Sequence, residues 1–311
     1  MKRIHGFSNL SADEKLDALV KSECFTQEDL NQLVSFRHPD SKMQALFEKF
    51  TENVVSAYHL PFSIAPNFLI NDILRHLPMV VEESSVVAAA SWSAKFWSKK
   101  GGFRTQVISE EKIGQIHFRW TGDFRNLLSH SDDLEQRMRQ SVENLTRNMD
   151  KRGGGIHKFE WINLSQEIDH IYQCRISFLT ADSMGANFIN STLETMGKEL
   201  QFQVENQFPD YPKPEVIMAI LSNYTPDCIV ECTIECPIKD LGDIRGVDDP
   251  HSFAEKFLTA VQIAEVDPYR AVTHNKGIFN GMDAVVLATA NDFRAFEAGG
   301  HAYASRTGKY S

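Results

Sequence analysis

The residues best suited to chemistry gather in one stretch, 267–292, which reads DPYRAVTHNKGIFNGMDAVVLATAND. Asp267 and Pro268 are typical of a turn, and Lys276 follows among polar residues and glycines, just before an apolar run. A lysine in this setting is expected to be half buried, and it can then polarise a carbonyl oxygen if a carboxylate keeps it charged. Asp292 is a candidate for that carboxylate if the fold brings the two side chains together. The alternative is a solvated loop that carries an ordinary surface lysine.

A pair of adjacent acids, Glu82 and Glu83, stands where a buried strand passes into an alanine-rich helix, in the segment VVEESSVVAAASWSAKFWSK. Carboxylates are rarely buried without partners, so two of them beside an apolar helix are unusual. Acidic side chains also suit the positive end of a helix. A solvated helix start therefore remains the simpler explanation of the pair.

Local patterns predict the elements that would position these residues. Capping boxes, in which a serine or threonine is followed three residues later by an acid, predict two helix starts, and apolar residues at helical spacing predict further helices. The predicted helices begin at Ser11 and Thr26 and span 41–60 and 252–266, and short strands are expected at 61–78. The last segment, 292–311, is expected to be a helix interrupted by Gly299 and Gly300.

The middle of the chain has a different pattern of apolar and polar residues. From about residue 108 it predicts a strand, an amphipathic helix, two strands, a helix and a strand, which is the β-α-β-β-α-β order of a ferredoxin-like unit. We therefore expect an α+β fold. A large mixed helical and sheet domain would be formed by 1–108 and 223–311, with a smaller ferredoxin-like domain inserted at 109–222.

One loop in the smaller domain, DSMGAN at 182–187, is a candidate ligand site. Gly185 would let the backbone come close to a ligand, and the free N–H groups of the helix that follows suit a pyrophosphate. A single glycine is a weak signal, because turns from strand to helix often need one. The loop is not the three-glycine dinucleotide fingerprint.

Composition limits the classes of function. The chain has 311 residues and a net charge of -10, which argues against nucleic-acid binding, although a local patch can still bind an anionic ligand. No apolar run is long enough to span a bilayer, and the N-terminal segment has no apolar core of the kind found in signal peptides. Five cysteines fit a reducing compartment. We expect a cytoplasmic protein with neither a nucleic-acid nor a membrane partner.

Three of the cysteines, Cys228, Cys232 and Cys236, recur every fourth residue and raise the question of a metal site. The segment is rich in β-branched residues and is predicted to be a strand. Residues four apart along a strand lie about 13 Å apart, which is too far for three sulfurs to share one ion. We therefore expect structural cysteines and no metal.

Five blocks of the sequence resemble, in the same order, the signature blocks of class II 3-hydroxy-3-methylglutaryl-CoA (HMG-CoA) reductases. They are 52–71, 78–91, 182–190, 270–292 and 298–311. The departures within them are small: Ser56, Ser84 and Ser183 stand where the family commonly has glycine, proline and alanine. The family continues well beyond Ser311, and its catalytic histidine and mobile lid belong to that later part.

The resemblance implies a four-electron, NAD(P)H-dependent reduction of HMG-CoA to mevalonate and CoA, or its reverse, in isoprenoid metabolism. It also implies a homodimer with shared active sites. The residues that it assigns are Glu83, Lys276 and Asp292 as catalytic groups and Ser85, Arg270 and Asn280 as substrate contacts. Lys276 would stabilise the carbonyl oxygen, and Glu83 would donate a proton, with a pKa raised by burial and by a neighbouring carboxylate. Asp292 would keep Lys276 charged and share a proton with Glu83, while Arg270 and Ser85 would hold the free carboxylate of the substrate.

The same resemblance implies an inserted dinucleotide-binding domain. Its cofactor residues would be Asp182, Met184, Gly185, Asn187 and Asn223. NAD users need a carboxylate that accepts hydrogen bonds from the ribose diol, yet counting back from Gly153 places Thr146 there, with Arg147 beside it and Lys151 and Arg152 close behind. This favours NADPH, with NADH possible, unless these residues are only solvated cations at a helix end. The alternative for the whole chain is a truncated, non-catalytic CoA-ester or dinucleotide-binding homologue. We expect the 311-residue chain to bind such ligands but to reduce HMG-CoA slowly or not at all.

Overall fold

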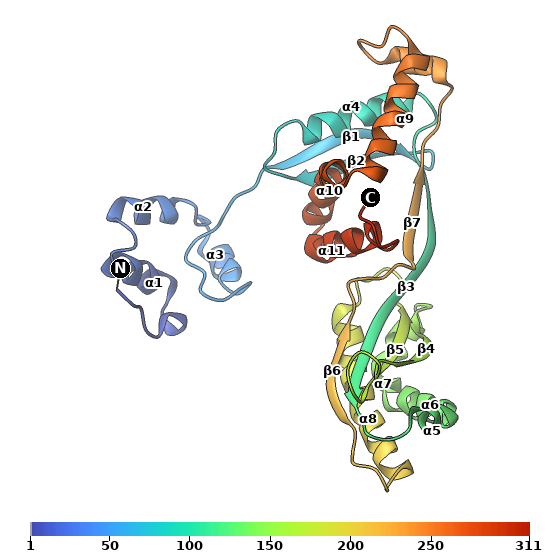
Figure 1. Ribbon diagram of the computed structural model, residues 1–311. Helices are drawn as coiled ribbons and strands as arrows, with labels where there is room; N and C mark the ends of the chain where they lie inside the picture. The colour runs from blue at the N-terminus through green and yellow to red at the C-terminus, as the bar shows by residue number, and fades with distance from the viewer. Residues whose placement is uncertain (1) are drawn as a thin grey trace. The chain divides into compact units, whose positions relative to one another are not determined.

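The computed structural model describes residues 2–311. The chain divides after Pro61 into two compact units, and each is described by itself (Figure 1). The sequence did not indicate this division. The boundaries that it predicts for an inserted domain, at 108 and 222, remain predictions.

The first unit is helical. It contains η1 (Phe7–Asn9), α1 (Ala12–Lys21), α2 (Gln27–Ser35) and α3 (Ser41–Phe47). Both predicted capping boxes are present: the Ser11 hydroxyl accepts a hydrogen bond from the Glu14 N–H, and the Glu14 carboxylate accepts one from the Ser11 N–H at 2.8 Å. Thr26 and Asp29 make the same exchange.

The third helix is shorter than its apolar pattern predicts. It ends at Phe47 instead of continuing toward residue 60. The segment that follows is tied back onto α2, because the Arg37 side chain donates to the carbonyl oxygen of Val55 at 3.1 Å and the Ser56 hydroxyl donates to that of Leu33. These contacts compete with a continued helix.

The second unit begins with a hairpin surrounded by helices (Figure 1). Its elements are β1 (Phe62–Ile70), β2 (Ile73–Val80), α4 (Val86–Ser98), η2 (Ile238–Asp243), α9 (Pro250–Val266), α10 (Pro268–Ala288) and α11 (Phe293–Ala304). Ala65 and Met79 of the hairpin and Ala284 of α10 form a small buried cluster, against which Val86 and Val87 of α4 pack. The predicted strands and the predicted helix at 252–266 are confirmed.

The central stretch is a continuous helix, whereas the sequence predicted a turn at Asp267 and Pro268 and left a solvated loop as one alternative. Asp267 caps α10 by accepting from the Tyr269 N–H at 3.0 Å, and Pro268 occupies the first turn, where its missing N–H has no cost. A helix interior tolerates glycine at about 1 kcal/mol each. Tertiary packing of the apolar end of α10 therefore outweighs Gly277 and Gly281.

The last helix is also continuous through its two glycines. A Cβ at Gly300 would lie 2.3 Å from Cζ of Phe279 on α10, and one at Gly299 would lie 2.9 Å from the carbonyl oxygen of Asn223. The glycines thus permit α11 to approach its neighbours closely. The predicted interruption was wrong.

A long strand, β3 (Arg104–Arg119), leads from the hairpin region to a second sheet (Figure 1). Its first half pairs with β7 (Cys228–Thr233), and its second half pairs with two further strands. The remaining elements are α5 (Phe124–Ser129), α6 (Ser131–Ser141), α7 (Glu143–Asp150), β4 (Gly155–Asn163), β5 (Ile171–Leu179), α8 (Ala186–Gln207) and β6 (Glu215–Leu221). The sheet order β4-β5-β3-β6, with antiparallel neighbours, fits the predicted β-α-β-β-α-β pattern.

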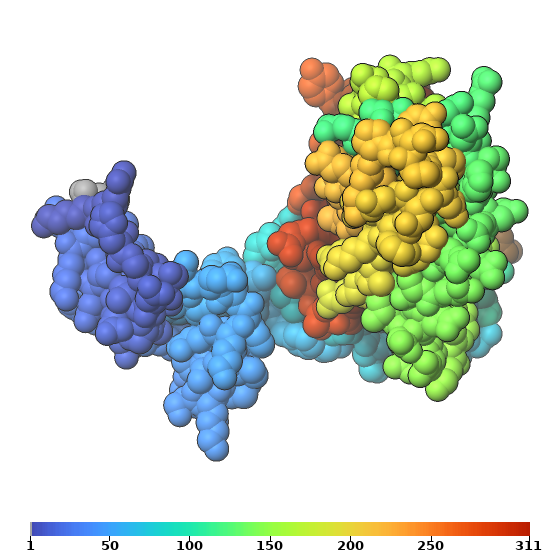
Figure 2. Space-filling model, turned by 90° about the horizontal axis from the view of Figure 1, so that it is seen from below, coloured from blue at the N-terminus to red at the C-terminus, as the bar shows by residue number. Residues whose placement is uncertain are grey.

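The helices of this part cover one face of the sheet. In Figure 2 the yellow residues of α8 lie beside the green residues of α5–α7. The amphipathic helix predicted at 131–149 is divided into two, α6 and α7, with a break at Val142, whose backbone angles are not helical. The short helix α5 precedes it and was not predicted. Phe118, Phe178 and Leu193 are fully buried in the core between sheet and helices.

The strand predicted at 228–238 is confirmed from Cys228 to Thr233, while Cys236 lies beyond its end. All five cysteines are unpaired. Within residues 2–311 no group of three or more histidine, cysteine or acidic side chains is arranged to hold a metal ion. Over the same residues, no helix has both the length and the hydrophobicity needed to cross a bilayer.

The turn after α4 offers a test of this packing. Gly102 has φ 77°, and a Cβ placed on it would lie 2.4 Å from the carbonyl oxygen of Leu69. Gly102→Ala is expected to lower the free energy of unfolding by about 2 kcal/mol, through backbone strain and steric overlap. Gly101→Ala is the matched control, since its φ is also positive but nothing lies within 4 Å. Urea denaturation measures both, and equal losses would contradict the importance of the close contact.

Candidate active site

The structure brings two of the predicted catalytic residues into contact. Lys276 Nζ on α10 donates to Glu83 Oε2 at 2.7 Å, and Asn280 Nδ2, one turn further along the helix, lies 3.4 Å from the same oxygen. Glu83 belongs to the short link between β2 and α4. Residues that are 193 positions apart in the chain therefore form one polar cluster.

Two anchored elements hold this cluster. Lys276 and Asn280 are four residues apart and so share one face of α10. The same helix is fixed two turns later by Ala284, which is buried against the hairpin. The link that carries Glu83 is held at both ends, by β2 and by the start of α4. The contact thus depends on how α10 packs against the hairpin.

The cluster is more open than the sequence suggested. The side chain of Lys276 is 60% exposed and that of Glu83 is 45% exposed. Water screens such a pair, and exposed ion pairs contribute roughly 0–1 kcal/mol to stability. The arrangement of these two residues is therefore not explained by a large gain in the stability of this chain.

Ser85 lies two residues after Glu83, at the start of α4. Its backbone is left-handed, with φ 76°, and its side chain makes no capping hydrogen bond. Non-glycine residues in this conformation are uncommon and often mark functional sites. Ser85 is thus an unusual backbone position two residues after Glu83.

Asp292 has a local role in this structure. It caps α11 by accepting from the Ala295 N–H at 3.1 Å, and the side chain of Arg294 lies 3.7 Å away. The carboxylate that contacts Lys276 is that of Glu83. The catalytic role of Asp292 remains a prediction.

Arg270 stands on another face of α10. It precedes Lys276 by six residues, which at 3.6 residues per turn places the two side chains about 120° apart around the helix axis. The structure therefore does not group Arg270 with Lys276, Asn280 and Glu83 on one helix face.

A second carboxylate pair joins α10 to α11, and the sequence did not single it out. Burial, and then contact with Glu297, raise the pKa of Asp283 to about 6. Asp283 Oδ1 is buried and has no hydrogen-bond partner among residues 2–311. Asp283 is seven residues after Lys276, so the pair lies two turns along the same side of the helix.

The predicted dinucleotide loop connects β5 to α8. Gly185 is the N-cap of α8, with φ 80°, and a Cβ there would lie 2.6 Å from Cγ2 of Thr180. No side chain caps this helix of 22 residues, so the N–H groups of its first turn are free for an anion. Asp182, Met184 and Asn187 are exposed around it.

The residues predicted to distinguish NADPH from NADH differ in their burial and in their contacts. Thr146 is buried in α7. Arg147 is exposed and donates to Asn144 Oδ1 at 2.8 Å within its own helix. Arg152 forms an ion pair at 3.2 Å with Asp182 of the loop. Of the predicted cations, Arg152 is thus the one that contacts the dinucleotide loop.

Asn223, the last predicted cofactor residue, is exposed just after β6. Its carbonyl oxygen lies close to Gly299 of α11. Asn190, which the sequence analysis did not assign, fixes the preceding residues, because its Oδ1 accepts from the Leu221 N–H at 2.9 Å. The start of α8 and the end of β6 are therefore linked.

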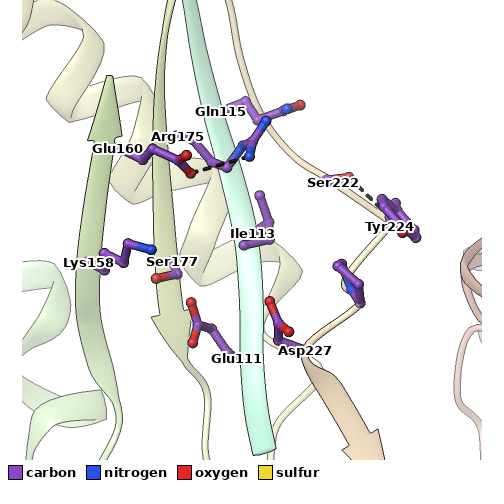
Figure 3. A pocket seen from close by; sticks show the side chains of 11 residues that line it. Glu111, Ile113, Gln115, Lys158, Glu160, Arg175, Ser177, Ser222, Tyr224 and Asp227 are labelled. Atoms are coloured by element: carbon purple, nitrogen blue, oxygen red, sulfur yellow. Dashed lines mark hydrogen bonds and ion pairs between the residues drawn. The ribbon is translucent and has the colours of Figure 1, made fainter. Parts of the chain in front are cut away.

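A hollow with an empty volume of about 650 Å³ lies on the second sheet (Figure 3). Its walls include Glu111, Ile113, Gln115, Lys158, Glu160, Arg175, Ser177 and Tyr224. The β3 and β5 residues among them alternate with the core residues of these strands, so the hollow lies on the face away from α6 and α8. None of the predicted catalytic residues lines it.

The chain belongs to the HMG-CoA reductase family, because residues 11–310 match the sequence profile described as hydroxymethylglutaryl-coenzyme A reductase. Two curated relatives agree. The 3-hydroxy-3-methylglutaryl-coenzyme A reductase of Archaeoglobus fulgidus is 30% identical over 97% of this chain, and the probable enzyme of Borreliella burgdorferi is 32% identical over 83%. The chain spans 65% and 56% of the lengths of these relatives.

The solved structures that resemble the chain include HMG-CoA reductases of Streptococcus pneumoniae. One of them, the class II enzyme bound to NADPH in open conformations, has a TM-score of 0.73 and 34% identity, and the similarity covers 100% of this chain and 80% of that one. A second structure from the same organism matches with the same score over 70% of its length. The predicted family and the α+β fold class are confirmed.

The carboxylate pair between α10 and α11 predicts a pH-dependent stability. The pKa of Asp283 rises from 3.8 to about 6 on folding, so its contribution to stability is fully present below pH 3.8 and is lost as the pH rises through about 6. Asp283→Asn should therefore raise the melting temperature at pH 7.5 and change it little near pH 4. Glu265→Gln, on an exposed position of α9, is the control. An equal shift of the Asp283→Asn protein at both pH values would contradict the assignment.

Proposed function

We propose that the chain carries the catalytic groups of an HMG-CoA reductase, which reduces HMG-CoA to mevalonate and CoA, or catalyses the reverse reaction. The observation that carries the proposal is the contact between Lys276 and Glu83. It places a cation and a carboxyl group at one point, contributed by two separately anchored elements. Reduction of a thioester needs both, because the carbonyl oxygen first gains negative charge and later gains a proton.

The proposed roles follow from charge. The ammonium of Lys276 stabilises the negative oxygen, as the donors of an oxyanion hole do. Glu83 in its protonated form is the donor to that oxygen. Asn280 Nδ2, at 3.4 Å, helps to orient the Glu83 carboxyl group.

We further propose that the loop at 182–187 holds the pyrophosphate of NAD(P)H. Gly185 adopts a conformation that glycine accommodates readily, and the uncapped start of α8 offers backbone N–H groups. The fit is therefore good for an anionic dinucleotide. When bound, the nicotinamide supplies hydride. The NADPH-bound relative supports a nicotinamide dinucleotide as the cofactor.

The proposed active unit is a homodimer. On α10 the apolar side chains of Tyr269, Val272 and Met282 are exposed, and the positions next to Gly277 and Gly281 are open. A second copy that covered this helix would bury apolar surface and exclude water from Lys276. Arg270 and Lys276 face different sides of α10. In a dimer with shared sites, each side of the helix could therefore contribute to a site.

The compartment that we propose is the cytoplasm. All five cysteines are unpaired in the structure. Free thiols are typical of proteins that work under reducing conditions.

The role of Lys276 predicts a large loss of turnover on substitution. Lys276→Ala in the active enzyme should lower kcat about a hundredfold or more, since losing one oxyanion donor typically costs that much. The dissociation constant for a CoA ester should change little. Lys256→Ala, on an exposed position of α9, is the control for the loss of a positive charge. Steady-state oxidation of NADPH measures the effect, and a kcat within tenfold of the wild type would exclude the role.

Cofactor selection predicts a difference between two arginines. Arg152 contacts the dinucleotide loop, whereas Arg147 is engaged within its own helix. We expect the wild type to prefer NADPH and Arg152→Ala to weaken NADPH binding about tenfold, with little effect on NADH, because only NADPH carries the 2′-phosphate.

Arg147→Asp tests the position that the sequence favoured, and we expect a smaller change in the ratio of the two dissociation constants. Fluorescence titration with each cofactor gives that ratio. If it is the same in the wild type and both variants, neither arginine recognises the phosphate.

A further inference from the structure

Lys112, which is not among the predicted site residues, contacts the dinucleotide loop from the neighbouring strand β3. Lys112 Nζ, on β3, donates to the carbonyl oxygen of Ser183 at 2.9 Å and to that of Met184 at 2.8 Å. Lys112 comes 70 residues before the loop in the sequence, and the antiparallel pairing of β3 with β5 places it there. The side chain is partly buried.

One of these two loop residues, Ser183, is held by a second pair of hydrogen bonds. The Thr180 hydroxyl donates to the carbonyl oxygen of Ser183 at 2.9 Å, and the Ser183 hydroxyl donates to that of Thr180 at 2.8 Å. The carbonyl groups of Ser183 and Met184 thus accept hydrogen bonds from donors within the protein. Since Gly185 then turns the chain into α8, the N–H groups at the helix start are left for a ligand.

The charge of Lys112 is not neutralised by an ion pair. Among residues 2–311 no carboxylate oxygen lies within 4 Å of its ammonium group, and Asp182 of the same loop is paired with Arg152 instead. Burial lowers the pKa of Lys112, while the charges of Cys228 and Glu110 act in the opposite direction. An unpaired ammonium group beneath a loop attracts an anion bound on that loop.

We propose that Lys112 is a positioning residue for the dinucleotide: it holds the carbonyl groups of Ser183 and Met184 away from the ligand and adds positive charge beneath the pyrophosphate. This inference rests on the proposed binding of NAD(P)H at the loop. It differs from the role of Arg152, because the pyrophosphate is common to both cofactors. Lys112 therefore affects NADPH and NADH equally, whereas a group that recognises the 2′-phosphate affects only NADPH.

The test uses the 311-residue chain and two variants at the same position. Lys112→Met removes the charge and both donors while keeping the length of the side chain, and Lys112→Arg keeps the charge and two donors. Lys198→Met, on an exposed position of α8 well beyond the loop, removes one positive charge without touching it. Fluorescence titration gives dissociation constants for NADPH and NADH, and a CoA ester titration and the melting temperature report on the rest of the fold.

We expect Lys112→Met to weaken both cofactors about tenfold, the size of a lost hydrogen bond to a charged group. The ratio between NADPH and NADH and the affinity for the CoA ester should stay unchanged. Lys112→Arg should recover most of the loss, and Lys198→Met should resemble the wild type. If Lys112→Met does not fold, Lys112→Gln, which keeps one amide donor but no charge, takes its place with the same expectation.

Two results would overturn the inference. One is a Lys112→Met protein that binds both cofactors within twofold of the wild type. The other is a loss confined to NADPH, which would assign the lysine to the 2′-phosphate. A wild-type chain that binds neither cofactor would instead contradict the proposed function at the loop, so the two failures are distinguishable.

Discussion

The site depends on the packing of α10 against the β1–β2 hairpin. Ala284 is buried in a cluster with Ala65 and Met79. This small cluster fixes the position of α10 relative to the link that carries Glu83. A shift of one residue would turn the helix by about 100° and carry Lys276 away from the carboxylate. Small residues at the contact let the helix and the hairpin approach closely, and the polar pair follows from that approach.

Local signals in the sequence correctly predicted those structural features that depend only on residues close together in the chain. The capping boxes at Ser11 and Thr26 need only a residue three positions away, and the structure contains both. The alternation and spacing at 109–222 likewise predicted the order of strands and helices, which the sheet β4-β5-β3-β6 confirms. Recognition of the family rested on blocks of residues in order and did not require the fold.

Contacts between distant segments were not predictable in the same way. The glycines and polar residues of 267–292 resemble a loop. Asp267 and Pro268 begin the helix locally, and the burial of Ala284 in tertiary packing explains why it continues through Gly277 and Gly281. The partner of Lys276 depends on how β2 and α10 meet. Lys112 has no local signature at all, since its role arises from the pairing of β3 with β5. In each case the sequence did not show which residues contact one another in the fold, although it did indicate the residue types that can do chemistry.

The exposure of the Lys276–Glu83 pair links the fold to the assembly. A cation stabilises a negative oxygen strongly only where water is excluded, because the Coulomb interaction falls with the local dielectric constant. In this chain the lysine side chain is 60% exposed, and apolar side chains of the same helix are exposed as well. The surface that would bury those apolar groups would also remove water from the pair. Under the proposed function, a partner that covers α10 therefore also strengthens the interaction of Lys276 with the negative oxygen of the substrate. Residues on both faces of the helix would then contribute to the site.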